Sequence, residues 1–333
     1  MRRFSFIIIN YSLLIFNCAD VSAQLKWTNV DSLYQPLPKS VHIYFTNQPM
    51  DTGTFRAYYL EADLKDNKLD FTVDTTLNRR LTPQKFYERD DKPVLVVNCT
   101  FFSFATNRNV NVIVKNGDLI CYDTSFVKGR GKDSLSRYFT LRSAIGFNKN
   151  NEADIAWVAA DSSMSYPVAF ESPKSPLLLD KYFTKTANFM NDDAIRNYLK
   201  PGATEHKILK WKMQTVVGGG PTLLQNGEVK ISNEEEMLFA GKAINDKHPR
   251  TAMGYTSDGR LIVLAIQGRS ESSGGATLIQ EAQIFKDLGC WEAMNLDGGG
   301  SSCMLVNGKS TIKVSDITGQ RPVPAVFIIK KHD

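Results

Sequence analysis

The sequence predicts an α+β protein with a mixed, mostly antiparallel β-sheet architecture, few helices and one strand–helix–strand (βαβ-like) crossover before a glycine-rich loop. Short runs of branched and aromatic residues predict the strands, and dipeptides that favour two-residue turns predict hairpins between them. A helical pattern is clear in only two places. With 333 residues, 42% of them hydrophobic, the chain is long enough to bury a full core.

Strand-like runs lie at residues 41–46, 55–64, 93–98 and 260–266, and each is too short for a helix. Hairpin turns are expected at four dipeptides, because asparagine, aspartate and glycine tolerate the backbone conformation that tight hairpins require. These are Asn116-Gly117, Asn226-Gly227, Asp258-Gly259 and Asn307-Gly308. Together they favour antiparallel pairing.

The clearest helix is expected over residues 277–288. Thr277 with Gln280 forms a capping box at its start, an apolar stripe follows, and Gly289 ends it. A second helix is predicted over 191–200, with Asn191 as its cap and Pro201 after its end.

The first residues predict a signal peptide over 1–23. They combine a basic start, an apolar run over 4–16 and the small residues Val21 and Ala23 at the spacing that a signal peptidase reads. The protein is therefore expected to be exported, periplasmic or secreted, and Cys18 gives a lipoprotein as the alternative. No later apolar run approaches the roughly 18 residues that span a bilayer, so no transmembrane segment is expected.

The remaining chain divides into an N-terminal strand-rich segment, 24–92, and a larger domain, 93–333. Within the larger domain, about 161–210 carries four prolines and little alternation. This stretch is expected to be an irregular insertion and a lid beside a site.

Charge and cysteine content narrow the function classes. The chain has 40 lysines and arginines against 35 acids, and this small excess does not indicate nucleic-acid binding. Four cysteines follow the predicted signal peptide, and either disulfides or buried thiols are compatible with their surroundings. Their spacing matches no zinc pattern, so no metal or cofactor is predicted. The four are Cys99, Cys121, Cys290 and Cys303.

Two phrases of the sequence echo each other. LRSAIGF at 141–147 resembles PRTAMGY at 249–255, and each follows an Asn-Gly hairpin phrase. Two structurally similar units would explain this echo. Chance recurrence of short strand-and-turn phrases explains it equally well.

The phrase AMNLDGGGSS, at 293–302, places one acid, Asp297, between an apolar run and three glycines. The strand, helix and strand before it predict two parallel strands with a right-handed connection, whose following loops emerge at one edge of the sheet. Arg269 and Asp297 are then neighbours. Alternation along the second strand puts Asn295 on the same face as Asp297.

The residues after Asp297 suit an anion, because glycines let backbone N–H groups approach a ligand closely. We take Gly298, Gly299, Gly300 and Ser301 as candidate substrate-binding residues.

Further candidates also fall at strand ends or on the predicted helix. His248 and Arg250 combine a proton-transfer group with a planar cation that fits phosphate oxygens. Glu281 is a reserve second carboxylate, and Glu271 is another. Additional binding candidates are Asn98, Gly219 and Gly220.

Each candidate taken singly has an ordinary structural explanation. An aspartate before glycines is usually a turn residue, and surface arginines are usually solvated. The phrase GGSSC lacks the last glycine of a nucleophile elbow, and GGGP lacks the Gly-Lys-Ser/Thr of a phosphate loop. Serine-hydrolase and nucleotide-binding functions are therefore excluded.

The combination of motifs resembles the phosphodiester glycosidase family. NCTFF, GGGPTLLQNG, HPRTAMGYTSDGRLIVLAIQGR, GGATL and GCWEAMNLDGGGSSCMLVNG occur in that order, with RPVPAVFII at the end, over roughly residues 94–330. The resemblance implies hydrolysis of the bond between the anomeric carbon of N-acetylglucosamine and a phosphodiester. In this sequence Cys99 stands where the family usually has glycine.

From these residues we expect Asp297 to act as nucleophile or base, with His248 and Glu281 as further catalytic candidates. Arginines and glycine amides would hold the phosphate, and Asn98 and Asn295 would bind sugar or orient the site. Two alternatives remain open: a metal-dependent phosphodiesterase with Asp297 and Asn295 as ligands, and a non-catalytic sugar-phosphate-binding protein.

Overall fold

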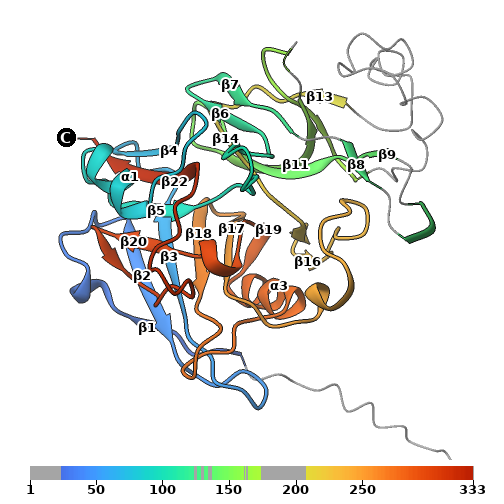
Figure 1. Ribbon diagram of the computed structural model, residues 1–333. Helices are drawn as coiled ribbons and strands as arrows, with labels where there is room; N and C mark the ends of the chain where they lie inside the picture. Colours follow the sequence, from blue (N-terminus) through green and yellow to red (C-terminus); the bar gives the residue numbers. More distant parts are fainter. Residues whose placement is uncertain are drawn as a thin grey trace, which may run out of the picture.

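The computed structural model describes residues 24–123, 126–128, 131–133, 137–160, 162, 164–173 and 208–332 (Figure 1). The predicted signal peptide, the predicted helix over 191–200 and most of the predicted insertion at 161–210 lie outside these residues. Among the described residues, no helix is long and apolar enough to cross a membrane.

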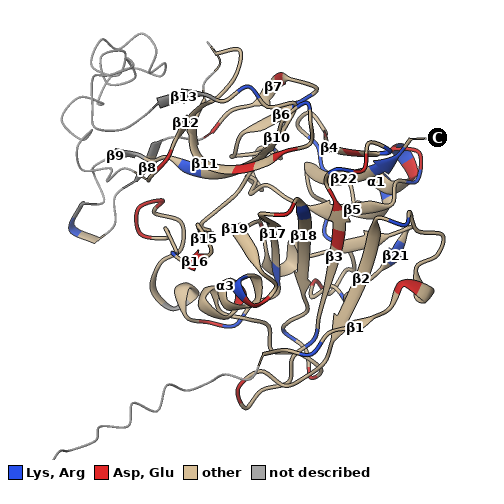
Figure 2. Ribbon diagram, turned by 180° about the vertical axis from the view of Figure 1, so that it is seen from behind, with Lys and Arg blue, Asp and Glu red and all other residues tan. Residues whose placement is uncertain are grey.

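Antiparallel strands dominate the regular secondary structure of the described chain, and α-helices are few, which confirms the predicted fold class. The largest sheet has eight strands, here in spatial order: β1 (Thr28–Asn29), β2 (Val41–Thr46), β3 (Ala57–Asp63), β18 (Arg260–Ile266), β17 (Arg250–Thr256), β19 (Cys290–Asn295), β15 (Thr222–Gln225) and β16 (Glu228–Val229). The strands of the N-terminal segment thus pair directly with strands near the C-terminus, as β3 and β18 do (Figure 2).

Three smaller sheets complete the described strands. The second sheet has seven strands: β13 (Ile208–Lys210), β12 (Val168–Phe170), β11 (Ala153–Ala159), β10 (Arg142–Phe147), β14 (Thr215–Gly218), β6 (Ile113–Lys115) and β7 (Asp118–Cys121). The third has five: β21 (Lys309–Ser310), β20 (Met304–Val306), β5 (Leu95–Asn98), β22 (Ala325–Lys331) and β4 (Leu69–Thr75). A separate pair joins β8 (Phe126–Lys128) to β9 (Arg137–Phe139).

Helices are few, as predicted. The described α-helices are α1 (Pro83–Arg89) and α3 (Leu278–Asp287), and short 3-10 turns are η1 (Asp31–Leu33), η2 (Gly131–Asp133), η5 (Gly241–Ile244) and η6 (Gly299–Ser301). Helix α3 begins with the predicted capping box, in which Thr277 and Gln280 each accept a hydrogen bond from the other's backbone N–H.

All four predicted Asn-Gly and Asp-Gly turns join consecutive antiparallel strands: β6 to β7, β15 to β16, β17 to β18 and β20 to β21. The asparagine and glycine of the Asn226-Gly227 turn both have positive φ, 54° and 76°. This conformation matches the twist of a two-residue hairpin, which is why that dipeptide predicts the turn.

The sequence echo corresponds to a repeated strand arrangement. The two echoing phrases form β10 and β17, and the order β7-β6-β14-β10-β11 in the second sheet parallels β16-β15-β19-β17-β18 in the first. In each case the later strand, β14 or β19, inserts between the two hairpins. This common order supports the interpretation of two similar units over chance recurrence.

The principal core lies among the three large sheets. It combines Leu60 of the first sheet, Phe147 of the second and Phe327 of the third, all almost fully buried. On its other face, the first sheet packs against α3, and the third sheet packs against α1 through Phe86. Burial of each such large side chain contributes about 1.5–3 kcal/mol, so these contacts fix the sheets relative to one another.

The predicted crossover is present, with one strand between its two ends. Strand β17 pairs antiparallel with both β18 and β19, so β18 and β19 run in the same direction without touching as neighbours. The loops after β18 and β19 therefore leave the sheet at one edge, beside the start of β17. This edge holds the candidate site.

Candidate active site

A cavity of about 320 Å³ lies at this edge and gathers six of the predicted site residues. The residues that line it come from the start of β17, the loops after β18, β19 and β5, and the segment around η5. They are Phe101, Phe239, Ala243, His248, Arg250, Arg269, Asp297, Gly298 and Gly299. The predicted proximity of Arg269 and Asp297 agrees with this arrangement.

Glycines let the three loops approach one another closely. A Cβ atom on Gly298 would lie 2.9 Å from the carbonyl oxygen of Pro249, and one on Gly275 would collide with the backbone of His248. The N–H of Gly299 donates a 2.8 Å hydrogen bond to the same Pro249 carbonyl. The glycine-rich loop is thus tied to the strand that carries Arg250.

The backbone of Asp297 is fixed from the neighbouring sheet. Its N–H donates to the carbonyl of Cys99 at 2.8 Å, and its carbonyl accepts from Nδ2 of Asn98 at 2.5 Å. The Oδ1 of Asn98 accepts from Thr251 Oγ1 and from the N–H of Cys303. Asn98 is fully buried, so all of its side-chain bonding serves to orient this edge.

The Asp297 carboxyl has an environment suited to proton transfer. Burial raises the pKa of Asp297 to about 7, while Ser301, the charge of Arg321 and the Gly298 backbone lower it in part. The side chain keeps partial contact with the cavity. A group with a pKa near the working pH can accept a proton and release it again, as a general base must.

Arg250 presents a buried guanidinium at the cavity wall. Its Nε donates to the carbonyl of Ala276 at 3.0 Å, and only 3% of the residue is exposed. Burial lowers the pKa of Arg250, the charge of Glu281 raises it, and Arg269 lowers it. An arginine at such a site stays protonated, so it is a fixed cation.

Glu281 is not among the residues that line the cavity. It is fully buried on α3, and neither carboxyl oxygen has a hydrogen-bond partner among the described residues. Burial raises the pKa of Glu281 to about 8, and the charge of Arg250 opposes this shift. At neutral pH the group is mostly a neutral acid near the guanidinium of Arg250.

His248 contacts the second arginine of the cavity. Arg269 Nη2 lies 3.4 Å from His248 Nδ1. Burial and the charges of Arg250 and Arg269 lower the pKa of His248, so the ring is neutral at pH 7. Since a guanidinium can only donate, Nδ1 must accept, and the ring proton is on Nε2.

The remaining backbone groups of the glycine-rich loop bond mainly within the loop. The N–H groups of Ser301 and Ser302 donate to the carbonyls of Gly298 and Gly299, forming η6. Ser301 is buried, and Gly300 is covered by the Arg321 side chain. Of the four loop residues that the sequence suggested for binding, Gly298 and Gly299 line the cavity, whereas Gly300 and Ser301 do not.

Besides Asn98, Gly300 and Ser301, three more predicted binding residues do not line the cavity. Asn295 is fully buried and donates from Nδ2 to the carbonyls of Gly220 and Leu296, at 2.7 and 2.8 Å. A Cβ on Gly219 would lie 2.8 Å from Leu296 Cδ2, and Gly220 packs against Glu236. These residues allow the segment between β14 and β15 to pack closely against the end of β19.

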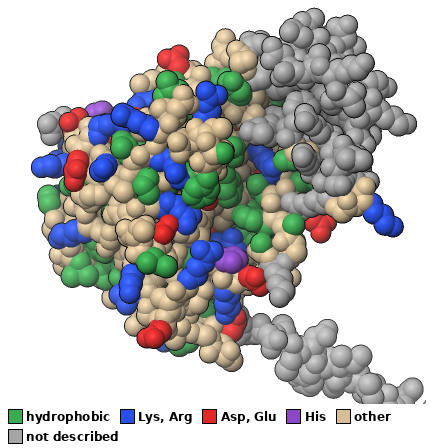
Figure 3. Space-filling model, viewed as in Figure 1, with side chains coloured by type: hydrophobic (Ala, Val, Ile, Leu, Met, Phe, Trp, Pro, Cys, Tyr) green, Lys and Arg blue, Asp and Glu red, His purple; other side chains and the backbone are tan. Residues whose placement is uncertain are grey.

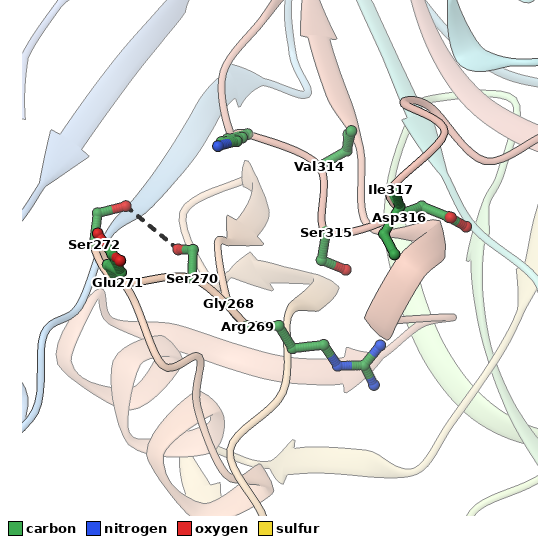
Figure 4. A pocket seen from close by; sticks show the side chains of 10 residues that line it. Gly268, Arg269, Ser270, Glu271, Ser272, Val314, Ser315, Asp316 and Ile317 are labelled. Carbon is green, nitrogen blue, oxygen red and sulfur yellow. Dashed lines mark hydrogen bonds between the residues drawn. The ribbon is translucent and has the colours of Figure 1, made fainter.

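A larger pocket of about 680 Å³ adjoins the cavity, and Arg269 lines both. Its lining is mostly polar and comes from the loop after β18 and the segment before Arg321, including Ser270, Ser315 and Asp316 (Figure 4). Figure 4 shows the Arg269 side chain extending away from Ser270 and Ser272. The backbone of Arg269 has a φ of 56°, a conformation uncommon for a side-chain-bearing residue.

Sequence reasoning missed the aromatic walls and a third arginine. Phe101 and Phe239 contact each other edge-to-face with ring centroids 6.1 Å apart, and Arg250 lies 5.8 Å from the Phe239 ring. Phe101 belongs to the NCTFF phrase, which was a usable signal, whereas nothing in the sequence distinguishes Phe239. Arg321 is distant from Asp297 in sequence, so only the fold brings it near.

The sequence was compatible with either disulfides or free thiols at the four cysteines. The four described cysteines are free thiols. Within the described ranges, no cluster of three or more histidine, cysteine, aspartate or glutamate side chains is arranged to hold a metal ion. On the face shown in Figure 3, acidic and basic side chains are interspersed.

Residues 178–330 match the sequence model of the phosphodiester glycosidase family. The matched region begins inside the stretch predicted to be an insertion. It includes β17, β18, α3, β19 and the glycine-rich loop, which form most of the cavity.

Two curated relatives align with parts of the chain. An uncharacterised SPbeta prophage-derived protein, YomE, of Bacillus subtilis is 45% identical over 73 residues, which are 22% of this chain and 11% of that protein. The N-acetylglucosamine-1-phosphodiester alpha-N-acetylglucosaminidase of Mus musculus is 29% identical over 109 residues, covering 30% of this chain and 21% of the mouse enzyme. The chain thus spans less than a quarter of the length of either relative.

The fold also resembles a solved structure over most of its length. The catalytic domain of the zebrafish N-acetylglucosamine-1-phosphodiester alpha-N-acetylglucosaminidase, auto-inhibited by its pro-peptide, superposes with a TM-score of 0.58 at 17% identity, over 93% of this chain and 89% of that domain. The resemblance to the phosphodiester glycosidase family that the motifs predicted is therefore confirmed, in sequence over residues 178–330 and in the fold of the described chain.

Proposed function

We propose that this protein is an exported glycoside hydrolase that cleaves a sugar-1-phosphodiester bond and releases the sugar from a phosphate-linked acceptor. The observation that carries this proposal is the meeting of Asp297 with Arg250, Arg269 and His248 in one cavity. A carboxyl beside two guanidinium groups suits a reaction in which a phosphate departs from an anomeric carbon.

The chemistry follows from the leaving group. As the bond between the anomeric carbon and the phosphate oxygen breaks, the electron pair stays on the phosphodiester, which becomes a phosphomonoester. Phosphate carries this charge well, and the fixed cations Arg250 and Arg269 stabilise it without a strong general acid. A single compelling carboxylate at the cavity is therefore sufficient, although most glycosidases use two.

Asp297 acts at the anomeric carbon in one of two ways. By direct attack, its carboxylate forms an ester bond to the anomeric carbon as the bond to phosphate breaks, and water then hydrolyses this ester to release the sugar; otherwise it removes a proton from the attacking water. In the second case the water hydroxyl joins the anomeric carbon, and its proton passes to Asp297 and then to solvent. The pKa of Asp297, raised to about 7, suits it to this proton exchange. The fixed Nε2–H of neutral His248 serves as a hydrogen-bond donor to the sugar or to a phosphate oxygen.

The two adjoining hollows suggest how the substrate lies. Arg269 lines both of them, so the phosphate is expected beside Arg269, with the sugar in the smaller cavity and the acceptor in the larger pocket. The walls of Phe101 and Phe239 provide apolar surface for a sugar ring. The name of the mouse relative supports N-acetylglucosamine in α linkage as the first sugar to test.

The test is to incubate the purified protein with a panel of sugar-1-phosphodiesters and to follow the released sugar by NMR, which also reports the anomeric configuration. We expect release of free sugar and a phosphomonoester, unaffected by a chelator. Binding without product after long incubation would favour a non-catalytic binder, and loss of activity with the chelator would favour a metal-dependent phosphodiesterase. Export is tested separately, by locating the full-length protein and determining the N-terminus of its mature form.

A further inference from the structure

A third guanidinium reaches the glycine-rich loop from the segment between β21 and β22. The Arg321 side chain occupies the space that a Cβ on Gly300 would need, so it lies directly against the backbone of that residue. Gly300 is three residues after Asp297. Only glycine at position 300 leaves room for this guanidinium.

Two other residues hold Arg321 in place. Its Nε donates to Asp316 Oδ2 at 2.8 Å, and its guanidinium carbon lies 5.5 Å from the ring centroid of Phe104. The Arg321 and Asp316 side chains are 26% and 25% exposed, so the ion pair is largely sheltered. An ion pair combined with stacking on an aromatic face restricts a guanidinium more than either contact alone.

Arg321 lines neither the cavity nor the larger pocket. Its influence on the site is therefore electrostatic and passes through Asp297. The other charged or titratable groups around Asp297 are Arg250, Arg269 and His248 in the cavity and the buried Cys99 thiol behind it.

We propose that Arg321 is a positioning residue whose positive charge, held against Gly300 by Asp316 and Phe104, keeps Asp297 ionised for the reaction. This inference rests on the role proposed above for Asp297. The charge of Arg321 lowers the pKa of Asp297 and so opposes the effect of burial. Without this cation, the carboxyl would be protonated over more of the neutral range.

The direct test is a ¹³C NMR titration of the full-length protein labelled at aspartate carboxyls, with Asp297→Asn used to assign the Asp297 signal. In Arg321→Gln the titration midpoint of Asp297 should rise by about one pH unit or more, because one opposite charge close to a carboxyl is lost. Arg321→Lys keeps the positive charge, so its Asp297 midpoint should stay close to the wild-type value. Arg80→Gln is the matched control, since Arg80 also stacks on Phe104, at 5.0 Å.

The kinetic test measures kcat/KM against pH with the best substrate of the panel. The acid limb of Arg321→Gln should move upward with the NMR midpoint, while Arg80→Gln keeps the wild-type profile. Gly300→Ala should reproduce the shift by displacing the guanidinium, which provides a second route if Arg321→Gln fails to fold.

An unchanged Asp297 midpoint in folded Arg321→Gln or Gly300→Ala would overturn the inference. A uniform loss of activity with an unmoved acid limb would likewise reduce Arg321 to a structural residue. If wild-type protein releases no sugar, the proposed function fails, yet the NMR titration still decides whether Arg321 controls Asp297.

Discussion

The side-chain amide of Asn98 donates a hydrogen bond to the backbone carbonyl of Asp297, with 2.5 Å between nitrogen and oxygen. Asn98 ends β5 in the third sheet, and Asp297 follows β19 in the first, so this bond joins two sheets at the cavity. The side-chain oxygen of Asn98, Oδ1, accepts hydrogen bonds from the Thr251 hydroxyl and the N–H of Cys303. Asn98 therefore holds the backbone of Asp297 against the third sheet, and its role in orienting the site stays a prediction.

Replacing Asn98 by alanine should destabilise the fold and slow the reaction. The change leaves the buried Cys303 N–H and Asp297 carbonyl without a partner, at a cost of about 1–3 kcal/mol for each unsatisfied group. Urea unfolding would measure the loss of stability. In buffer without urea, kcat should fall, because the backbone of Asp297 is less well held. Wild-type stability in Asn98→Ala would contradict this role.

Replacing Asp297 by asparagine should lower turnover by about a thousandfold or more, because the reacting carboxyl is removed. Wild-type turnover should rise with pH through an acid limb near pH 7, where burial has placed the pKa of Asp297. Released sugar, measured by NMR across a pH series, checks both points. A folded Asp297→Asn with near-normal turnover would remove Asp297 from the chemistry.

Asp297→Asn, which should lower turnover, should raise the stability of the fold above neutral pH. Because the folded-state pKa of Asp297 is raised to about 7, above the unfolded value near 4, its stabilising contribution is present at low pH and is lost as pH rises through 7. The loss begins above the unfolded pKa near 4 and is complete only above 7, so Asp297→Asn should raise Tm at pH 8, by a few degrees, and leave Tm almost unchanged at pH 4. Equal effects at both pH values would show that ionisation is not the cause.

Replacing Arg250 or Arg269 by lysine should reduce kcat/KM by about 10²-fold or more, because the planar fork that fits phosphate oxygens is lost. Arg260→Lys is the matched control. Arg260 lies at the opposite end of β18 and pairs with Glu61 and Asp258 outside the cavity. Measured with one panel substrate under identical conditions, kcat/KM should fall in the two cavity variants and stay near the wild-type value in Arg260→Lys.

Replacing Glu281 by glutamine should leave most of the turnover intact at pH 6.5. Glu281 does not line the cavity, and its pKa of about 8 makes it mostly neutral at that pH, so glutamine reproduces its charge state. Initial rates on the best panel substrate check this. A loss comparable to that of Asp297→Asn would instead establish Glu281 as the second catalytic carboxylate.

The sequence by itself determined the strands, the hairpins and the capped helix α3, because these depend on residues close together in the chain. The Asn226-Gly227 turn needs positive φ at both positions, and the capping box of Thr277 and Gln280 spans four residues, so each can be recognised locally. The NLDGGGSS phrase likewise marked Asp297, and the strand–helix–strand order predicted that Arg269 would lie near it.

Only the tertiary structure decided which candidates share the cavity. Three features depend on segments far apart in sequence. These are the position of β17 between β18 and β19, the burial of Glu281 on α3 and the contact of Arg321 with Gly300. Asn295 and Gly220 carried the right chemistry at strand ends, yet they bond to each other beneath the site. Residue type and spacing show what a group can do, whereas packing between sheets decides which groups meet, how deeply Asp297 is buried and, through burial, where it titrates.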